Sequence, residues 1–327
     1  MGAAFQVPPF LERPPWLTGD LQTLRNFIRR PFHDLATWPE RRLEVNLPDG
    51  DLLVAHIHHP EAAPRAYAIL IHGLSGCADS TYVRATARHL LSRGCGVVRL
   101  NLRGAGPSAS LCRSQYHAGR SEDIRAALAA LASGLPGGVP LIGIGYSLGG
   151  NVLLKYLGEE GRGAALAASV VVSTPLDLAA ASQRLLAPRN RFYQDYLVTR
   201  MKVEALADPE SLTSPEARVV QATRTVFDFD DRFVAPRHGF AGAADYYARC
   251  SASRYLDGIR PPTLVIHGLN DPWIPAAVYH AVPWGRLPSL TPLLPRGGGH
   301  VGFHGIDSRV AWHDRCAGLF VDRVVNQ

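Results

Sequence analysis

The pentapeptide Gly145-Tyr146-Ser147-Leu148-Gly149 has residue types and spacing that suit nucleophilic catalysis. It follows the pattern G-x-S-x-G, with an apolar run before it and a helical pattern after it. Glycines two before and two after the serine leave room for a sharp strand-to-helix turn, which presents the Ser147 hydroxyl at a helix N-terminus. A serine hydroxyl is a weak nucleophile until a base takes its proton. We therefore look for a base, and for an acid that orients it.

Candidates for both partners follow apolar runs further along the chain. Asp271 comes just after the run 263–267, and His300 follows the last run in a loop that begins with three glycines, 297–299. The carboxyl ends of strands in an α/β sheet meet at one edge, so we expect these side chains to lie near Ser147. In this arrangement His300 takes the serine proton and Asp271 fixes the tautomer of the imidazole.

Other residues compete for the same roles. Asp271 precedes a proline and is also typical of an ordinary turn. Three more aspartates are candidates for the acid, although none follows a strand of the repeating pattern: Asp177, Asp230 and Asp231. His304 is the main rival base. We favour His300 because the glycines before it let an imidazole approach another backbone closely.

Two backbone N–H groups are expected to stabilise the oxyanion of a tetrahedral intermediate, where losing one donor costs roughly 3–4 kcal/mol. The first is the N–H of Leu148, the residue after the nucleophile. The second comes from the loop after the run 67–71, and we assign it to Leu74. His72 in this loop is interpreted as structural support.

The elements that position these residues follow from hydrophobic periodicity. The segment 42–57 predicts a β-hairpin with a turn at 48–51. Beyond it, continuous apolar runs predict strands at 67–71, 96–101, 139–146, 167–173, 263–267 and 290–294. Amphipathic helices are predicted between and after them at 81–93, 121–135, 148–157 and 307–325. This alternation predicts an α/β fold with a mostly parallel sheet, an N-terminal antiparallel hairpin and helices on both faces.

The alternation is interrupted once, which divides the chain into four parts. Residues 1–40 are proline-rich and predict an N-terminal arm packed on a domain surface. Residues 41–173 form the first part of the core and 262–327 the second. The interval 174–261 is too long for one crossover and contains helical patterns, so we predict a helical cap inserted into the core.

Motifs along nearly the whole chain resemble the YheT-like branch of the α/β-hydrolases, which is related to the abhydrolase-domain lipases and esterases. The matching segments are Leu21-Gln22-Thr23, His72-Gly73-Leu74, Asn101-Leu102-Arg103-Gly104, Tyr116-His117-Ala118-Gly119, 145–157, Tyr246-Tyr247 and 298–303. The resemblance implies the α/β-hydrolase fold and hydrolysis of carboxylic esters. By position, the triad of the family falls on Ser147, Asp271 and His300. Departures at Asp20, where relatives often carry His, and at Ser75, where an acidic residue is frequent, leave substrate preference open.

The resulting hypothesis is a serine esterase that works through an acyl-enzyme and needs no cofactor. Its substrates would be short- to medium-chain esters, acylglycerols or phospholipids. The same triad would support acyl transfer to an alcohol, or cleavage of an amide as an amidase or peptidase. A hydrolase fold without catalysis, used only for binding, is the alternative from another class. The oligomeric state does not follow from the sequence.

The composition narrows the choice of partners. The chain has 327 residues with 46% hydrophobic and 19% charged side chains, which indicates a globular protein. Lys and Arg number 34 against 28 Asp and Glu, giving a formal charge of +6, and only Lys155 and Lys202 are lysines. The arginines are dispersed and interleaved with acids, so we interpret them as solvated surface and expect no nucleic-acid partner.

The cysteines and the histidine cluster bear on the compartment of the protein and on metal binding. The five cysteines are scattered without a CxxC pair, and neither a leader segment nor an apolar run of about 18 residues is present, so we predict a cytoplasmic protein. Transient contact with a membrane surface is left open, without stable insertion. His56, His58 and His59 are close in sequence but lack matching Cys or carboxylate spacing. We expect a solvated strand face there, with no metal and no dinucleotide site.

Overall fold

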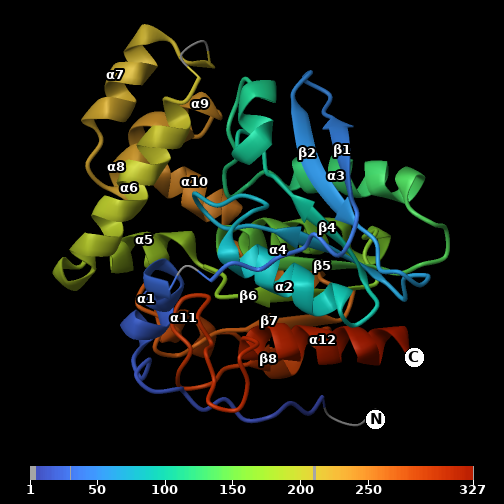
Figure 1. The fold of residues 1–327 in the computed structure, drawn as a ribbon. Coiled ribbons are helices and arrows are strands. Elements are labelled where there is room, and N and C mark those ends of the chain that lie inside the picture. The colour runs from blue at the N-terminus through green and yellow to red at the C-terminus, as the bar shows by residue number, and fades with distance from the viewer. Residues whose placement is uncertain (1–4, 30, 209–210, 327) are drawn as a thin grey trace.

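An eight-stranded sheet forms the centre of the computed structural model, which describes residues 5–29, 31–208 and 211–326. Its strand order is β1-β2-β4-β3-β5-β6-β7-β8 (Figure 1). The strands are β1 (Glu40–Asn46), β2 (Leu52–His58), β3 (Tyr67–Ile71), β4 (Gly96–Leu100), β5 (Leu141–Tyr146), β6 (Ala168–Val172), β7 (Thr263–Ile266) and β8 (Leu290–Leu293).

The direction of the strands confirms the predicted fold class. β1 pairs with β2 as an antiparallel hairpin, β2 pairs antiparallel with β4, and every later pair is parallel. In the parallel part, Ile71 of β3 lies opposite Leu100 of β4 and Gly145 of β5. The carboxyl ends of these strands therefore reach one edge of the sheet together. The loops that follow them start side by side.

Both faces of the sheet are buried, and most residues of its central strands are apolar. In β3, the side chains of Tyr67, Ile69 and Ile71 join one hydrophobic cluster, and Ala68 and Leu70 join another. This is the period-two alternation of a strand with a core on each side. Burying a side chain of this size contributes about 1.5–3 kcal/mol to folding.

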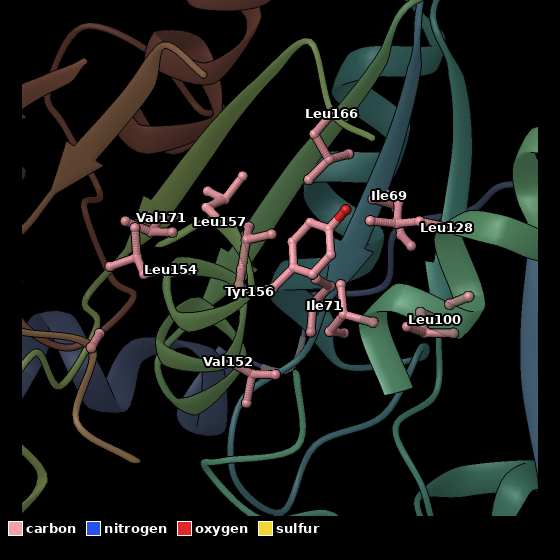
Figure 2. Close-up of a cluster of buried hydrophobic side chains, with 14 of the residues drawn as sticks. Ile69, Ile71, Leu100, Leu128, Val152, Leu154, Tyr156, Leu157, Leu166 and Val171 are labelled. Carbon is pink, nitrogen blue, oxygen red and sulfur yellow. The ribbon is translucent and has the colours of Figure 1, made fainter. Parts of the chain in front are cut away.

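Helices cover the two faces. α3 (Ser121–Gly134) and α4 (Leu148–Glu160) pack on the first cluster, and Figure 2 shows part of it, including Ile69, Leu128 and Val152. α2 (Thr81–Leu91) and α12 (Trp312–Val325) pack on the second. The short α11 (Ala276–His280) places Tyr279 in the first cluster.

The interval between β6 and β7 folds into helices with a hydrophobic cluster of their own, which includes Leu197, Met201 and Phe233. These cap helices lie to one side of the sheet (Figure 1). They are α5 (Leu178–Leu186), α6 (Arg191–Ala205), α7 (Ser214–Ala222), α8 (Val226–Phe229), α9 (Ala235–Arg237) and α10 (Ala243–Cys250). Local signals start them: Thr213 forms a capping box with Glu216 before α7, and proline follows in its first turn.

The structure differs from the sequence prediction at both ends of the chain. A helix, α1 (Gly19–Arg29), lies inside the arm, where no helix is predicted. The last helix starts at Trp312 rather than at 307. The reason is that the arm pairs with the segment before it: Glu12 and Gly305 form an antiparallel bridge, and the Ile306 N–H donates to Leu11 O. Among the helices described, none is long and apolar enough to cross a membrane.

Candidate active site

Ser147 sits at the tight turn between β5 and α4, with a φ of 49° and a ψ of −120°. A positive φ is uncommon for a residue with a side chain and costs about 1–3 kcal/mol, so the surrounding structure must enforce it. A Cβ on Gly145 would lie 2.6 Å from Gly150 Cα, and one on Gly149 would clash with His72 O. The glycines of the motif are therefore required by close backbone approach.

His300 and Asp271 lie in line with this serine. The Nε2 atom of His300 is 3.0 Å from Ser147 Oγ, and its Nδ1 is 2.8 Å from Asp271 Oδ2. The other Asp271 oxygen accepts from the backbone N–H groups of Trp273, at 2.8 Å, and Ile274, at 3.1 Å. Because a carboxylate only accepts, Nδ1 carries the proton and Nε2 is free to accept from the serine hydroxyl.

The electrostatics of this buried chain favour an ionised Asp271. Burial raises the pKa of the carboxyl, but the nearby His300, through its charge and its hydrogen bond, brings the pKa below its ordinary value, with the Trp273 N–H adding to this effect. The Trp273 ring also stacks on the His300 imidazole with centroids 4.2 Å apart. Asp271 thus holds the imidazole by a hydrogen bond at its edge, and Trp273 packs against one of its faces.

The His300 loop is fixed by contacts that sequence reasoning did not assign. The His300 N–H donates to Thr23 Oγ1 of α1 at 2.8 Å, and the Val301 N–H donates to Ser173 Oγ at 3.0 Å. Gln22 of α1 accepts from the His304 N–H at 2.7 Å. The only signal for these residues is the resemblance of Leu21-Gln22-Thr23 to a family motif, which gives no role.

The loop after β3 lies directly against the nucleophile. The Gly73 N–H donates to Tyr82 Oη at 2.9 Å and the Ser75 N–H donates to Tyr116 Oη at 2.7 Å. Between them, the Leu74 N–H has no hydrogen-bond partner among the described residues, and neither has the Leu148 N–H at the start of α4. Both amides are available to a bound molecule.

Two cavities meet at Ser147, and His300, Leu74 and Trp273 line both. The first, about 120 Å³, reaches under the cap between mainly apolar side chains of α5, α6 and α8 and the segment after them. The second, about 270 Å³, lies between α1, α6 and the loop after β3 and includes Arg200. An apolar compartment and a more polar one therefore both adjoin Ser147.

Two carboxyls line the cap-side cavity, the half-buried Glu204 and the buried Asp230. Burial raises the pKa of Glu204 to about 7, against the effect of the Tyr116 hydroxyl, which donates to its Oε2 at 3.1 Å. Burial also raises the pKa of Asp230 to about 7, against a 2.7 Å hydrogen bond from Tyr247. Near neutral pH these groups are partly protonated, so the compartment carries little net charge.

The rival acids and base have other partners than Ser147, although Asp230 lines the same cavity. Asp177 accepts from the Ala180 N–H as the N-cap of α5, Asp230 belongs to the cap, and Asp231 accepts from the Ala243 N–H. His304 is buried in a different cavity. None of the four forms a hydrogen bond with Ser147, His300 or Asp271 in the described part of the chain.

Other singled-out residues have structural contacts. His72 is fully buried, and its Nδ1 donates to Gly73 O while its Nε2 accepts from the Leu102 N–H. Arg103 is buried against three carboxylates: Asp49, Asp51 and Asp123. The solvated face expected for the histidine cluster is wrong for His58, which is buried and contacts Arg99 and Trp38 O. No metal-binding cluster of His, Cys, Asp or Glu occurs among the described residues.

Comparison with known proteins places this geometry in context. A family model described as the alpha/beta hydrolase fold matches residues 69–305. YheT of Escherichia coli (strain K12), a protein named as a putative esterase, is 35% identical over 292 residues, which cover 87% of this chain and 84% of that protein. Phospholipase ABHD3 of Mus musculus is 28% identical over 276 residues, 83% of this chain and 64% of its own length.

A solved structure shows the same fold at low identity. The Pyrococcus furiosus esterase Pf2001 aligns with a TM-score of 0.59 and 15% identity, covering 88% of this chain and 93% of that one. This identity supports the fold alone.

Proposed function

The chain belongs to the α/β-hydrolase family, and from this premise we propose that it is a serine hydrolase that cleaves carboxylic esters through an acyl-enzyme. One observation carries the proposal: Ser147, His300 and Asp271 form a hydrogen-bonded chain of 3.0 Å and 2.8 Å that begins at a strained turn. Such a chain provides a nucleophile, a base and a group that orients the base. The names of the relatives, which include an esterase and a phospholipase, support the same activity.

In the first half-reaction, His300 takes the proton of Ser147 as the hydroxyl oxygen attacks the ester carbonyl. The imidazolium then gives that proton to the departing alcohol, which leaves the acyl group on the serine. In the second half-reaction, water attacks the acyl-enzyme while His300 removes its proton, and the carboxylic acid is released. Asp271 stays ionised throughout, because its pKa lies below the ordinary value and its second oxygen is held by backbone N–H groups.

The oxyanion of each tetrahedral intermediate would be held by the N–H groups of Leu74 and Leu148. Both groups lack a partner within the described chain, although the amides on either side of Leu74 donate to tyrosine hydroxyls. The neighbouring hydrogen bonds fix the loop, so the free amides are oriented before substrate arrives. Preorganised donors of this kind require no rearrangement as charge develops.

The two compartments beside Ser147 suggest how an ester would lie. The apolar cavity under the cap suits a short- to medium-chain acyl group, and the cavity between α1 and α6 suits the alcohol part. Acylglycerols and phospholipids fit this division because their polar part would face Arg200. The prediction of a cytoplasmic enzyme stays, and it rests on five cysteines that are all free.

Hydrolysis of nitrophenyl esters from acetyl to palmitoyl tests the proposal, with Ser147→Ala as control. We expect the highest kcat/KM for short or medium chains, and a fall of roughly a millionfold in kcat for the variant. If Ser147→Ala hydrolysed the esters as fast as the native chain, the role of Ser147 would be refuted. Turnover of matched nitroanilides but not of esters would favour an amidase, and ester formation with added alcohol in excess of hydrolysis would favour an acyltransferase.

A further inference from the structure

A second large cavity lies away from Ser147, between the N-terminal arm, α1, α2 and the segment 302–314. Its volume is about 860 Å³. Arginines from four separate segments line it: Arg13, Arg25, Arg29, Arg88 and Arg309. Arg13 and Arg25 are half-buried, and the other three are exposed at the mouth. These arginines are dispersed in the sequence and three of them are solvent-exposed as expected, but the fold gathers all five around one cavity.

None of these arginines forms an ion pair within the described residues. Arginines elsewhere in the fold differ: buried Arg99 pairs with Glu40 and Asp79, and Arg103 with three aspartates. Asp314 is the one acidic side chain lining the cavity in the described chain, and it already accepts from Thr86 and contacts His313. The five arginines therefore outnumber the one carboxylate of the lining, and none of them has an ion-pair partner among the described residues.

This concentration of charge acts on the groups within it. Burial and then the charges of Arg13 and Arg29 lower the pKa of Arg25. An array of like charges in a partly buried space costs free energy, which a bound anion would remove.

The floor of the cavity offers hydrogen-bonding groups without partners. His304 and His313 are more than nine-tenths buried, and His304 Nε2 and His313 Nδ1 have no hydrogen bond among the described residues. His89 Nε2 at the side is also unpaired. Burial, followed by the charge of Arg25, lowers the pKa of His304 to about 3, so this imidazole is neutral and supplies an N–H donor or a lone pair.

We propose that this cavity binds a small anion that carries one or more phosphate groups. Arginines of four segments border it, and the planar fork of a guanidinium group binds phosphate oxygens in bidentate pairs. The cavity is large enough for more than a single ion, and aromatic side chains of Trp16, Trp38 and Tyr82 form part of its wall. The neutral imidazole of His304 would add a further donor.

The site would be coupled to the His300 loop through α1. Arg25 lies on the same helix as Thr23, which accepts from the His300 N–H, and Gln22, which accepts from the His304 N–H. An anion held between Arg25 and Arg88 would tie α1 to α2. Because it binds only the folded protein, it would also raise the melting temperature.

Two sources could present this phosphate. A free molecule would enter from solvent, whereas a lipid headgroup would come from a membrane surface. Val310 of the lining is exposed, and so are Ile28 and Phe32, which lie next in sequence to lining residues, so the second source needs its own measurement.

Calorimetric titration of the full chain with pyrophosphate tests the proposal directly. We expect saturable binding that Arg88→Glu weakens by about tenfold or more, as loss of a charge-assisted contact predicts. Arg286→Glu is the matched control, since Arg286 is exposed on the far β8 side, has no ion pair in the described chain and makes the same charge change. Arg309→Glu serves as a second variant, and melting temperatures check that all of them fold.

A parallel arm uses vesicles of phosphatidylcholine with and without phosphatidic acid. Binding of pyrophosphate, or of phosphatidic acid vesicles only, supports the proposal and identifies the source, provided that Arg88→Glu weakens it and Arg286→Glu does not. The proposal is overturned if neither ligand binds, if the two variants bind alike, or if citrate binds more tightly than pyrophosphate.

Discussion

The loop 297–304 faces two cavities that treat charge in opposite ways. On one side His300 contacts Asp271, and the nearby carboxyls Glu204 and Asp230 are drawn toward neutrality by burial. On the other side His304 lies among arginines that have no ion pair within the described residues. The first cavity is balanced without a ligand, and the second is not.

This difference separates two kinds of function. A neutral ester needs a pocket in which charge appears only during reaction, and the balanced cavity meets that need. An anion needs charge that is present before it arrives, and the basic cavity provides it. Changes in the first cavity should therefore alter turnover or its pH dependence without altering pyrophosphate binding.

Among substitutions that leave the nucleophile in place, the largest effect is expected for Asp271→Asn. The amide can still accept from the two backbone N–H groups but holds the wrong tautomer of His300, so kcat/KM should fall by about 10⁴. Asp177→Asn is the matched control, because Asn also caps a helix. Ester kinetics of both variants give the answer, with pyrophosphate binding unchanged in each. Equal activity of the two variants would contradict the role of Asp271.

Asp230→Asn should change how stability depends on pH. The folded pKa of Asp230, about 7, lies above its ordinary value, so the native state keeps a proton that the unfolded chain has lost, and stability falls as pH rises from about 4 to 7. The upper bound of this loss is about 4 kcal/mol. Denaturant unfolding at pH 5 and pH 8 should show a smaller difference for the variant than for the native chain. Asp271 has the opposite sign: its contribution is lost only as pH falls through its lowered pKa. An unchanged pH dependence in Asp230→Asn would show that this carboxyl is not buried in solution.

Thr23→Val tests the arm as a support for the base. The variant keeps the shape of the side chain but removes the acceptor for the His300 N–H, so we expect kcat to fall by about tenfold with little change in KM. Thr199→Val, exposed on α6 with a hydroxyl bonded only to its own helix, is the control. Because α1 lines both the cavity that includes Arg200 and the basic cavity, this variant should also weaken pyrophosphate binding. A KM effect without a kcat effect would contradict a positioning role.

The smallest effect is expected for Tyr116→Phe. Removing the hydroxyl leaves the Ser75 N–H without its acceptor and Glu204 without its donor, which should loosen the loop that carries Leu74. We expect kcat for nitrophenyl butyrate to fall by about threefold, with pyrophosphate binding unchanged. The control is Tyr255→Phe, whose hydroxyl donates to Arg249 O at the surface. A larger loss of kcat in Tyr255→Phe than in Tyr116→Phe would show that Tyr116 does not support the oxyanion loop.

Much of the fold could be predicted because its signals are local. The strands around β5 are continuous apolar runs, and the turn at Ser147 is marked by its own glycines. The residues Asp271 and His300 could be proposed because each follows a strand, and parallel strands bring such positions to one edge. The predicted start of the last helix was wrong because a distant segment, the arm, pairs with the residues before that helix.

The remaining features depend on contacts between segments far apart in the chain. Thr23 and His300 are 277 positions apart, and no periodicity links them. The arginines of the basic cavity lie between positions 13 and 309, where each looks like an ordinary surface residue. Only the packing of the arm against α2 and the segment 302–314 shows that they share one space. Sequence patterns report how an element folds, but not which distant charge it will meet.

The central claim is that Ser147 is an activated nucleophile. A fluorophosphonate probe tests it most directly, because the probe forms a covalent bond only with a serine that a base has activated. We predict a single adduct on the intact protein by mass spectrometry, located on the peptide that contains Ser147 and absent from a folded Ser147→Ala variant. No adduct on the folded native chain, or an adduct at another residue, would contradict the account.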